Sequence, residues 1–292
     1  MSGRVLVTLD GRFHDPDQPL LCADDLAAVR GDGIFETMLV RGGAACGLEL
    51  HLARLATSAV ALDLPTPELD RWRNVVDLAV GAWTRDSTAE GALRLVISRG
   101  REIGGDITGY VTVGPVHERV ASARAHGVSA ITLNRGYSVD FAAAAPWQLL
   151  GAKTLSYATN MAALRHAARL GADDVIYLSS DGMVLEGPRS TVVLATGKSL
   201  VTPRPENGIL AGTTVDALFR VASGMGYTCT RADVAQSDLV DAESLWLVSS
   251  ITLAARVTAL DGVALTTTGA VEEFRTMVDL AVRGDGDHSL DR

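Results

Sequence analysis

The first 116 residues alternate between short apolar runs and longer stretches in which apolar residues recur every three or four positions. The short runs end at glycine-containing turn signals such as Asp10-Gly11, which is typical of β-strands. In the longer stretches the spacing is that of the buried stripe of an amphipathic helix. The pattern predicts strands at Arg4–Leu9, Ile34–Val40, Ala92–Ser98 and Tyr110–Val116, and helices at Leu48–Leu62 and Leu69–Trp83.

A polar, weakly patterned segment at His117–Gly127 precedes the second part of the chain. Beyond it, apolar residues that share one helical face predict a helix from about Thr154 to Leu170. Short apolar runs between turn signals predict most of the other elements. These are strands at Val128–Leu133, Asp174–Ser179, Met183–Glu186, Thr191–Ala195, Ser244–Val248 and Arg256–Leu260, and helices at Thr213–Met225 and Gly269–Val282.

The order of these elements favours an α+β fold with two domains, because it lacks the regular alternation of a doubly wound parallel sheet. With 292 residues, of which 47% are apolar, the chain is long enough to bury two hydrophobic cores. We therefore predict a smaller N-terminal α/β domain at residues 1–116, an interdomain connection at 117–127 and a larger C-terminal domain at 128–292.

Charge and composition argue against several classes of protein. The net charge of −9 leaves no basic stripe to follow a phosphate backbone, so nucleic acid is not the expected partner. No stretch reaches the ~18 uninterrupted apolar residues of a membrane span, and the N-terminus has no basic start followed by an apolar run. Cys22, Cys46 and Cys229 are too far apart for a disulfide framework. We predict a cytoplasmic protein; a small anionic ligand remains compatible with locally gathered arginines.

Lysine is rare in this chain, which draws attention to the two that are present. Of the 26 basic residues only Lys153 and Lys198 are lysine, and Lys198 lies in a polar turn between two apolar runs. Lys153 lies among small and apolar neighbours, where a loop meets a helical pattern. Unlike arginine, a partly buried lysine can lose its proton, and a neutral amine can form a Schiff base. An equally simple interpretation is a lysine that extends to solvent from a helix end.

Four local motifs could bind a ligand, although each also has a structural explanation. A glycine turn entering a strand, an arginine on a solvated helix face, an ordinary helix N-cap and a simple hydroxyl-rich turn would explain them equally well. A helix start that carries hydroxyl groups can also attract phosphate. The motifs are Gly31-Asp-Gly-Ile-Phe-Glu-Thr, His51-Leu-Ala-Arg-Leu, Gly208-Ile-Leu-Ala-Gly-Thr-Thr-Val-Asp and Ser249-Ser-Ile-Thr-Leu.

Taken together with Lys153 and Glu186, these motifs resemble the class IV, or branched-chain type, family of pyridoxal-phosphate enzymes. This family includes branched-chain and D-amino acid aminotransferases and aminodeoxychorismate lyase. The resemblance covers about Gly31 to Val257 and keeps the order of the motifs in the family. It implies a two-domain fold of type IV, with pyridoxal 5'-phosphate as the cofactor and the larger C-terminal domain as the cofactor-binding domain.

The resemblance also implies roles for particular residues. Lys153 matches the lysine that holds the cofactor covalently and later moves the substrate α-proton. Glu186 matches the glutamate beside the pyridine nitrogen, which lets the ring accept electrons. The positions that bind the cofactor phosphate in the family are matched by Arg54, Thr213, Thr214, Ile251 and Thr252. Tyr157 lies one residue away from the position of a tyrosine that contacts the cofactor in some members.

The reaction is open between two members of the family. Thr37 occupies the position where the lyases have a threonine whose hydroxyl can assist proton transfer, which favours aminodeoxychorismate lyase and the synthesis of the folate precursor 4-aminobenzoate. Arg99 is the candidate for a substrate carboxylate. No histidine lies two residues beyond Arg99, as a D-amino acid transaminase would have, yet a D-amino acid or branched-chain aminotransferase remains the alternative.

The resemblance further implies a homodimer that acts on a small amino substrate. A non-catalytic binding protein on the same fold is poorly supported, because both Lys153 and Glu186 are present. No metal site is predicted, because the histidines lack partners at ligand spacing. The histidines considered are His51, His117, His126 and His166.

Overall fold

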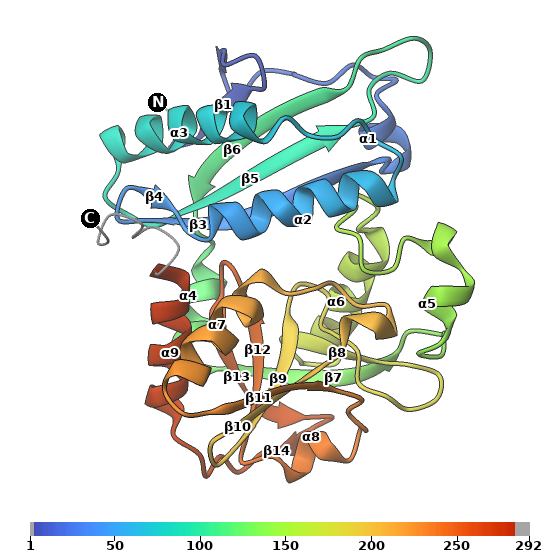
Figure 1. Ribbon diagram of the computed structural model, residues 1–292, viewed down its shortest axis with the longest axis vertical. Helices are drawn as coiled ribbons and strands as arrows, with labels where there is room; N and C mark the ends of the chain where they lie inside the picture. The colour runs from blue at the N-terminus through green and yellow to red at the C-terminus, as the bar shows by residue number, and fades with distance from the viewer. Residues whose placement is uncertain (1–2, 284–292) are drawn as a thin grey trace. The chain divides into compact units, whose positions relative to one another are not determined.

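The computed structural model describes residues 3–283, which divide into two compact units. Unit 1 contains residues 3–117 and 152–157 together with Arg283, and unit 2 contains residues 118–151 and 158–282. Both units combine helices with a β-sheet (Figure 1), so the predicted α+β class is confirmed. Residues 1, 2 and 284–292, which the predicted domains include, lie outside the described residues.

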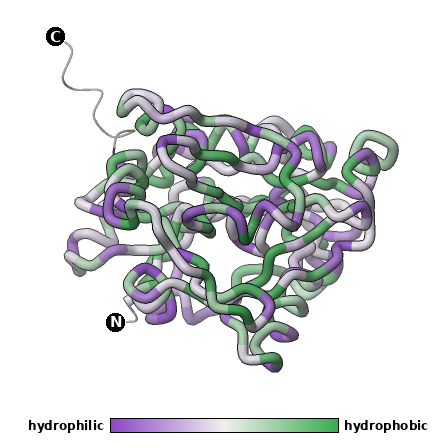
Figure 2. Tube along the Cα trace, turned by 90° about the horizontal axis from the view of Figure 1, so that it is seen from below, coloured by the Kyte–Doolittle hydropathy of each residue, from purple (hydrophilic) through white to green (hydrophobic). Residues whose placement is uncertain are grey.

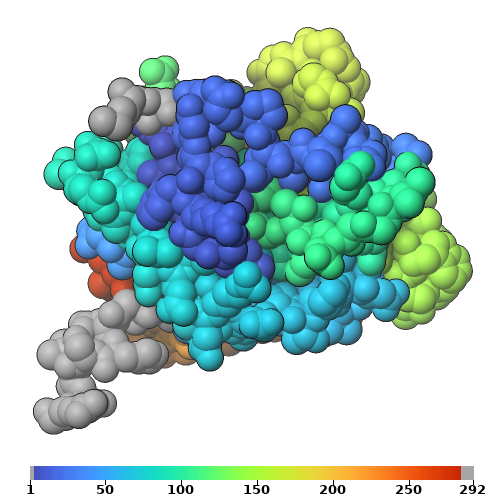
Figure 3. Space-filling view, turned by 90° about the horizontal axis from the view of Figure 1, so that it is seen from above, coloured from blue at the N-terminus to red at the C-terminus, as the bar shows by residue number. Residues whose placement is uncertain are grey.

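Unit 1 is built on an antiparallel sheet with the strand order β2-β1-β6-β5-β3-β4. The strands are β1 (Val5–Thr8), β2 (Phe13–His14), β3 (Gly33–Arg41), β4 (Ala44–Ala45), β5 (Gly91–Ser98) and β6 (Thr108–Pro115), and the helices are α1 (Leu26–Arg30), α2 (Leu48–Ala61) and α3 (Leu69–Asp86). Figure 3 shows α3, in cyan, beside the blue segment that contains β1, and the two elements are in contact.

The two faces of this sheet differ in what covers them. Ile34, Glu36 and Met38 of β3 are fully buried on the face that α2 and α3 cover. The alternate residues Phe35 and Thr37 are only half-buried on the opposite face. Because side chains alternate along a strand, successive residues of β3 fall into these two sets.

Unit 2 contains a mixed sheet with the strand order β11-β10-β9-β12-β13-β7-β8, and β14 pairs with β13. The pairs β10–β11, β7–β13 and β7–β8 are parallel, and the others are antiparallel. The strands are β7 (Val128–Asn134), β8 (Asp174–Leu178), β9 (Thr191–Thr196), β10 (Ser199–Pro203), β11 (Thr228–Ala232), β12 (Ser244–Ser249), β13 (Leu253–Leu260) and β14 (Val263–Ala264). The helices are α4 (Glu118–His126), α5 (Phe141–Ala144), α6 (Ala158–Arg169), α7 (Thr213–Gly224), α8 (Asp238–Asp241) and α9 (Val271–Arg283), with 3₁₀ turns at η1 (Pro146–Gln148) and η2 (Pro205–Asn207).

The core of unit 2 lies where helices cover the sheet. Trp246 of β12 stacks on Phe274 of α9, with ring centroids 4.3 Å apart and planes 14° from parallel. Both side chains are buried, and such a pair stabilises the core beyond its area of burial alone. The apolar strand and the amphipathic helix predicted from sequence therefore meet at these two residues.

Strands β10 and β11 were not predicted, and three segments named in the prediction have a different structure or start. Residues 118–126, within the predicted connection, form α4, because Val120 and Ala123 are buried one helical turn apart in an otherwise charged segment. Met183 and Val184 make only isolated bridges instead of a strand. Helix α6 begins at Ala158 rather than Thr154, because residues 153–155 pair with β3 in unit 1.

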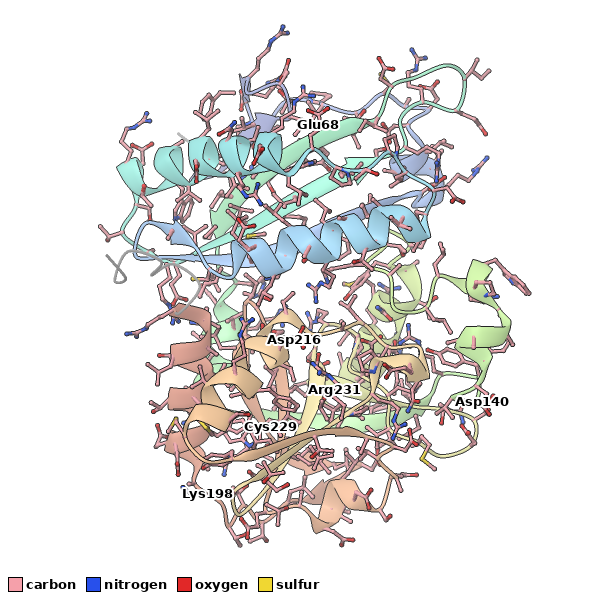
Figure 4. All side chains as sticks on the ribbon, viewed as in Figure 1. Glu68, Asp140, Lys198, Asp216, Cys229 and Arg231 are labelled. Atoms are coloured by element: carbon pink, nitrogen blue, oxygen red, sulfur yellow. The ribbon has the colours of Figure 1, made fainter. Side chains whose placement is uncertain are left out.

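Lys198 lies where the sequence places it, in the exposed turn between the antiparallel strands β9 and β10 (Figure 4).

Hydrophobic and hydrophilic stretches alternate along the trace in Figure 2. Among residues 3–283, no helix is long and apolar enough to cross a membrane.

Candidate functional site

Lys153 is held at the edge of β3 in unit 1 by backbone hydrogen bonds. The Phe35 N–H donates to the Lys153 carbonyl at 3.0 Å, and the Leu155 N–H donates to the Gly33 carbonyl at 2.8 Å. The Lys153 N–H in turn donates to Ser58 Oγ of α2 at 3.1 Å. Because both its backbone polar groups are engaged, the position of Lys153 is set by a strand and a helix rather than by a free loop.

Two glycines of the Gly31-Asp-Gly motif make this approach possible. A Cβ at Gly33 would lie 2.8 Å from Leu155 Cδ1, and a Cβ at Gly31 would lie 2.8 Å from Ser156 Oγ. Gly31 also has a φ of 70°, a conformation that side chains rarely adopt. The motif therefore serves the close packing of β3 against residues 153–156.

The amine of Lys153 lies over an aromatic ring. Its Nζ is 4.5 Å from the centroid of Phe35, and the edge of Tyr157 meets the same ring at a centroid distance of 5.6 Å. Thr37, which sequence analysis assigned to proton transfer, points to the same side of β3 as Phe35. Thr37 pairs with Arg94 of β5, so this exposed arginine, which sequence analysis missed, also points to that side.

Arg54, predicted from the resemblance to bind phosphate, forms a bidentate ion pair with Glu36. This pair lies on the face of β3 opposite to Phe35 and Thr37. Arg54 Nε donates to Glu36 Oε1 and Arg54 Nη2 to Glu36 Oε2, both at 2.8 Å. His51 Nδ1 lies 2.6 Å from Glu36 Oε2. Burial raises the pKa of the Glu36 carboxyl, but the charge and hydrogen bonds of Arg54, together with His51, outweigh burial and hold that pKa well below its usual range.

Sequence analysis did not single out Glu36, although a signal was present. Glu36 occupies an inward position in the alternating pattern of β3, where its neighbours Ile34 and Met38 are apolar. A carboxylate at such a position needs partners, because burial of a lone charge is costly. The partners, His51 and Arg54, lie one turn apart on α2 and belong to a motif that the sequence did flag.

Unit 1, which contains His51, should become less stable toward unfolding in mild acid. Burial is the main cause that lowers the pKa of His51 below 6.5, its ordinary value. The unfolded chain therefore binds a proton that the folded chain excludes, so the stabilising effect is complete above about pH 6.5 and is lost as the pH falls below it. We expect the free energy of unfolding to decrease by up to about 1.4 kcal/mol per pH unit for this one group.

Urea unfolding at about pH 7.5 and about pH 5.5 checks this expectation. The difference between the two midpoints should be smaller in a His51→Gln variant, which keeps the other histidines. Equal pH dependence in the variant and the wild type would contradict it.

Glu186 is held in unit 2 by two contacts. Arg135 Nη1 donates to Glu186 Oε1 at 2.9 Å, and the Leu210 N–H donates to Glu186 Oε2 at 3.1 Å. The guanidinium of Arg135 lies over the rings of Tyr177, at 4.8 Å, and Tyr137, at 5.7 Å. Arg135 was not predicted from sequence, because nothing local distinguishes it from a surface arginine.

The two hydroxyl-rich turns of unit 2 meet. Helix α7 begins at Thr213 after the N-cap residue Gly212, which has no side chain to cap the helix, and the helix start carries the positive end of a helix dipole. Ser250 Oγ, a residue that sequence analysis did not choose, lies 3.1 Å from Thr214 Oγ1 and 3.4 Å from Thr213 Oγ1. Such a group of hydroxyls at a helix start is suited to an anion.

Neighbouring contacts fix the shape of these turns. A Cβ at Gly212 would lie 2.4 Å from Thr191 Oγ1, so the start of α7 packs closely on β9. Arg231 of β11 forms an ion pair with Asp216 in the first turn of α7 (Figure 4). In the second turn, the Thr252 N–H donates to Ser249 Oγ, and Arg124 of α4 donates to the Ile251 carbonyl.

Arg99, predicted to bind a substrate carboxylate, has structural partners in unit 1. Its Nε donates to Asp32 Oδ2 at 2.7 Å, and its Nη2 donates to the Leu62 carbonyl at the end of α2. A cation is stabilising at a helix C-terminus, so these contacts explain the residue without a substrate. Among residues 3–283, no group of three or more His, Cys, Asp or Glu side chains could hold a metal ion.

Unit 1 thus presents a lysine amine above an aromatic ring, and unit 2 presents a hydroxyl-lined helix start and an oriented carboxylate. Groups of these kinds are suited to an enzyme that binds a phosphorylated aldehyde cofactor through a lysine. The family model "Amino-transferase class IV" matches residues 33–260. The chain therefore belongs to the class IV aminotransferase family, and it is a pyridoxal-phosphate enzyme of fold type IV.

Similar proteins agree with this assignment. The chain is 56% identical, over 96% of its length and 100% of the relative, to a protein of Mycobacterium tuberculosis named bifunctional aminodeoxychorismate lyase / D-amino acid transaminase. A solved structure of a hypothetical aminotransferase from M. tuberculosis, in a PLP-bound form, superposes with a TM-score of 0.95 at 57% identity and covers 97% of this chain and 99% of its own. A fold IV transaminase from Curtobacterium pusillum has a TM-score of 0.92 at 39% identity, covering 98% and 100%.

Proposed function

We propose that this enzyme is a 4-amino-4-deoxychorismate lyase, which converts aminodeoxychorismate to 4-aminobenzoate and pyruvate, a step in folate precursor synthesis. The observation that carries the proposal is Thr37, a hydroxyl on the same side of β3 as Phe35, whose ring lies 4.5 Å from Lys153 Nζ. The name of the M. tuberculosis relative, which includes the lyase, supports it. The reaction splits one molecule into two and needs no second substrate.

The residues that would hold the cofactor come from both units. Lys153 would hold it covalently, Glu186 would contact its pyridine nitrogen, and Arg54 with the α7 start would bind its phosphate. The other phosphate groups would come from the residues Thr213, Thr214, Ile251 and Thr252, to which we add Ser250. When bound, pyridoxal phosphate supplies a carbonyl for the substrate amine and a ring that accepts electrons from a broken bond.

Lys153 and Thr37 would take part in different proton transfers. Lys153, once its amine is free and neutral, takes the proton from the substrate carbon that bears the amine. The Phe35 ring supports the amine from one side and has no basic group that would compete with it for the proton. The Thr37 hydroxyl assists proton transfer to the departing enolpyruvyl group, which leaves as pyruvate. The ion pair with Arg135 and the Leu210 N–H hold the Glu186 carboxylate in one orientation.

A D-amino acid aminotransferase activity in the same site is the second candidate. The M. tuberculosis relative is named for both activities, and a solved structure of a protein from that organism is an α-ketoglutarate and PMP bound form. Arg99 stays our predicted receptor for the substrate carboxylate, and Arg94 is added as a candidate because it is exposed opposite Thr37.

We also propose a homodimer, which light scattering of the purified protein would test.

A spectrum and a coupled assay in one cuvette test the proposed function. We expect a yellow protein that releases pyruvate, detected with lactate dehydrogenase, from aminodeoxychorismate without any keto acid. Release of no pyruvate, together with turnover of a D- or branched-chain amino acid and 2-oxoglutarate, would replace the lyase by the aminotransferase.

Replacing Thr37 with glycine should separate the two activities. We expect pyruvate release to fall by about tenfold or more, because a proton-transfer group is removed, while amino transfer changes much less. The measurement is kcat for both reactions in the same preparation. Thr37→Ser, which keeps the hydroxyl, should retain pyruvate release, and equal losses in both reactions for the glycine variant would remove Thr37 from this role.

A further inference from the structure

Glu36 is a fully buried carboxylate whose partners belong to α2. The side chain of Glu36 has no exposed surface, and those of His51 and Arg54 are 2% and 12% exposed. Both oxygens of Glu36 accept a hydrogen bond from Arg54, and Oε2 also lies 2.6 Å from His51 Nδ1. Three polar side chains thus occupy the space between β3 and α2 that apolar side chains could fill.

Stability alone does not explain this group. Removing a carboxylate and a guanidinium from water is costly, and well-packed apolar residues often stabilise such a position as well or better. A buried ion pair does, however, fix orientation, because a planar guanidinium bound through two of its edge nitrogens cannot rotate. The bonds to Nε and Nη2 therefore define the plane of the Arg54 guanidinium and the direction in which its remaining N–H groups point.

The same strand also places the lysine. The Phe35 N–H, next to Glu36 in the chain, donates to the Lys153 carbonyl at 3.0 Å, and Ser58 of α2 accepts from the Lys153 N–H. Residues 35 and 36 of β3 therefore connect to both the predicted phosphate ligand and the predicted covalent ligand of the cofactor. A shift of Arg54 relative to this strand would change the distance between the side chain proposed for the cofactor phosphate and the side chain proposed for its aldehyde carbon.

We propose that Glu36 is a positioning residue that holds Arg54 in the orientation in which it binds the cofactor phosphate, with His51 fixing the second oxygen of Glu36. The proposal rests on the phosphate role proposed above for Arg54. It assigns to Glu36 an effect on binding of the cofactor phosphate and none on binding of the ring and aldehyde, and this difference separates positioning from a general contribution to folding.

Binding of pyridoxal phosphate and of pyridoxal to the full-length apoenzyme, followed by absorbance, tests the proposal. Pyridoxal has the same ring and aldehyde but no phosphate, so the ratio of the two affinities reports the phosphate contacts alone. We expect Glu36→Gln to lower the affinity for pyridoxal phosphate by at least about tenfold and to leave the affinity for pyridoxal nearly unchanged. Equal losses for both compounds, or no loss for either, would overturn the proposal.

A double-mutant cycle identifies the partner through which Glu36 acts. Arg54→Gln should lower the same ratio, and the double variant should lower it no further than Arg54→Gln alone. Additive losses would show that Glu36 acts without Arg54 and would overturn the proposal. An unchanged ratio in Arg54→Gln would instead show that the proposed phosphate role of Arg54 is wrong, and the positioning role would fall with it.

A second ion pair on α2 provides the matched control. Glu49 accepts two hydrogen bonds from Arg73, at 2.8 and 2.7 Å, but its side chain is 56% exposed. Glu49→Gln should leave both affinities unchanged. If Glu36→Gln fails to fold, Glu36→Asp is the second variant, because it keeps the charge but shortens the side chain by one methylene. It should also lower the ratio of the affinity for pyridoxal phosphate to that for pyridoxal. An unchanged ratio would count against the proposal.

Discussion

Replacing Lys153 with alanine should abolish turnover and the absorption band of the lysine-linked cofactor. We expect the rate to fall to less than about one ten-thousandth of the wild-type value, because one side chain supplies both the covalent link and the proton transfer. The backbone of residue 153 should keep its place, since its hydrogen bonds to Phe35 and Ser58 involve main-chain groups. The absorbance spectrum and the pyruvate assay measure the two effects separately.

Lys198 offers an unusually clean control for this variant. It is the second of two lysines in the chain and lies exposed in the turn between β9 and β10. Lys198→Ala removes the same number of atoms and the same charge, so we expect it to leave spectrum and rate unchanged. Full activity in Lys153→Ala would refute the assignment of the covalent site.

Replacing Glu186 with glutamine should give the second largest effect. We expect the enzyme to retain its cofactor but to lose about 10²–10³-fold in rate, because a neutral amide stabilises positive charge at the pyridine nitrogen less than a carboxylate does. The amide oxygen can still accept from Arg135 or from the Leu210 N–H, which both contact Glu186. The fold around residue 186 should therefore persist.

Measurement of cofactor content together with kcat distinguishes this effect from loss of the cofactor. Glu68→Gln, at an exposed position just before α3 (Figure 4), should change neither quantity. An unchanged rate in Glu186→Gln would show that another group interacts with the ring nitrogen. Loss of the cofactor in this variant would show that Glu186 is needed to bind the cofactor rather than to increase the reaction rate.

The predictable parts of the fold were those in which burial leaves a local pattern in the sequence. The apolar stripe along α2 and the apolar run along β3 each reflect contact with a core, and the structure has both elements within a few residues of the predicted bounds. Helix α4 was missed because only Val120 and Ala123 of it are buried. The start of α6 was misplaced because residues 153–155 are taken up by pairing with a distant strand, which no local pattern records.

The sequence by itself determined the family and its cofactor, because a lysine in a nearly lysine-free chain, a glutamate and the glycine and hydroxyl motifs occur in the order that the family has. The family model matches residues 33–260, which contain most of these motifs. Only the tertiary structure decided which side chains act on one another. Glu36 meets Arg54, Arg135 meets Glu186 and Ser250 meets Thr214 because strands and helices bring residues 18, 51 and 36 positions apart into contact. Such pairings depend on register and packing, which are properties of the folded chain and leave no periodic signal in the sequence.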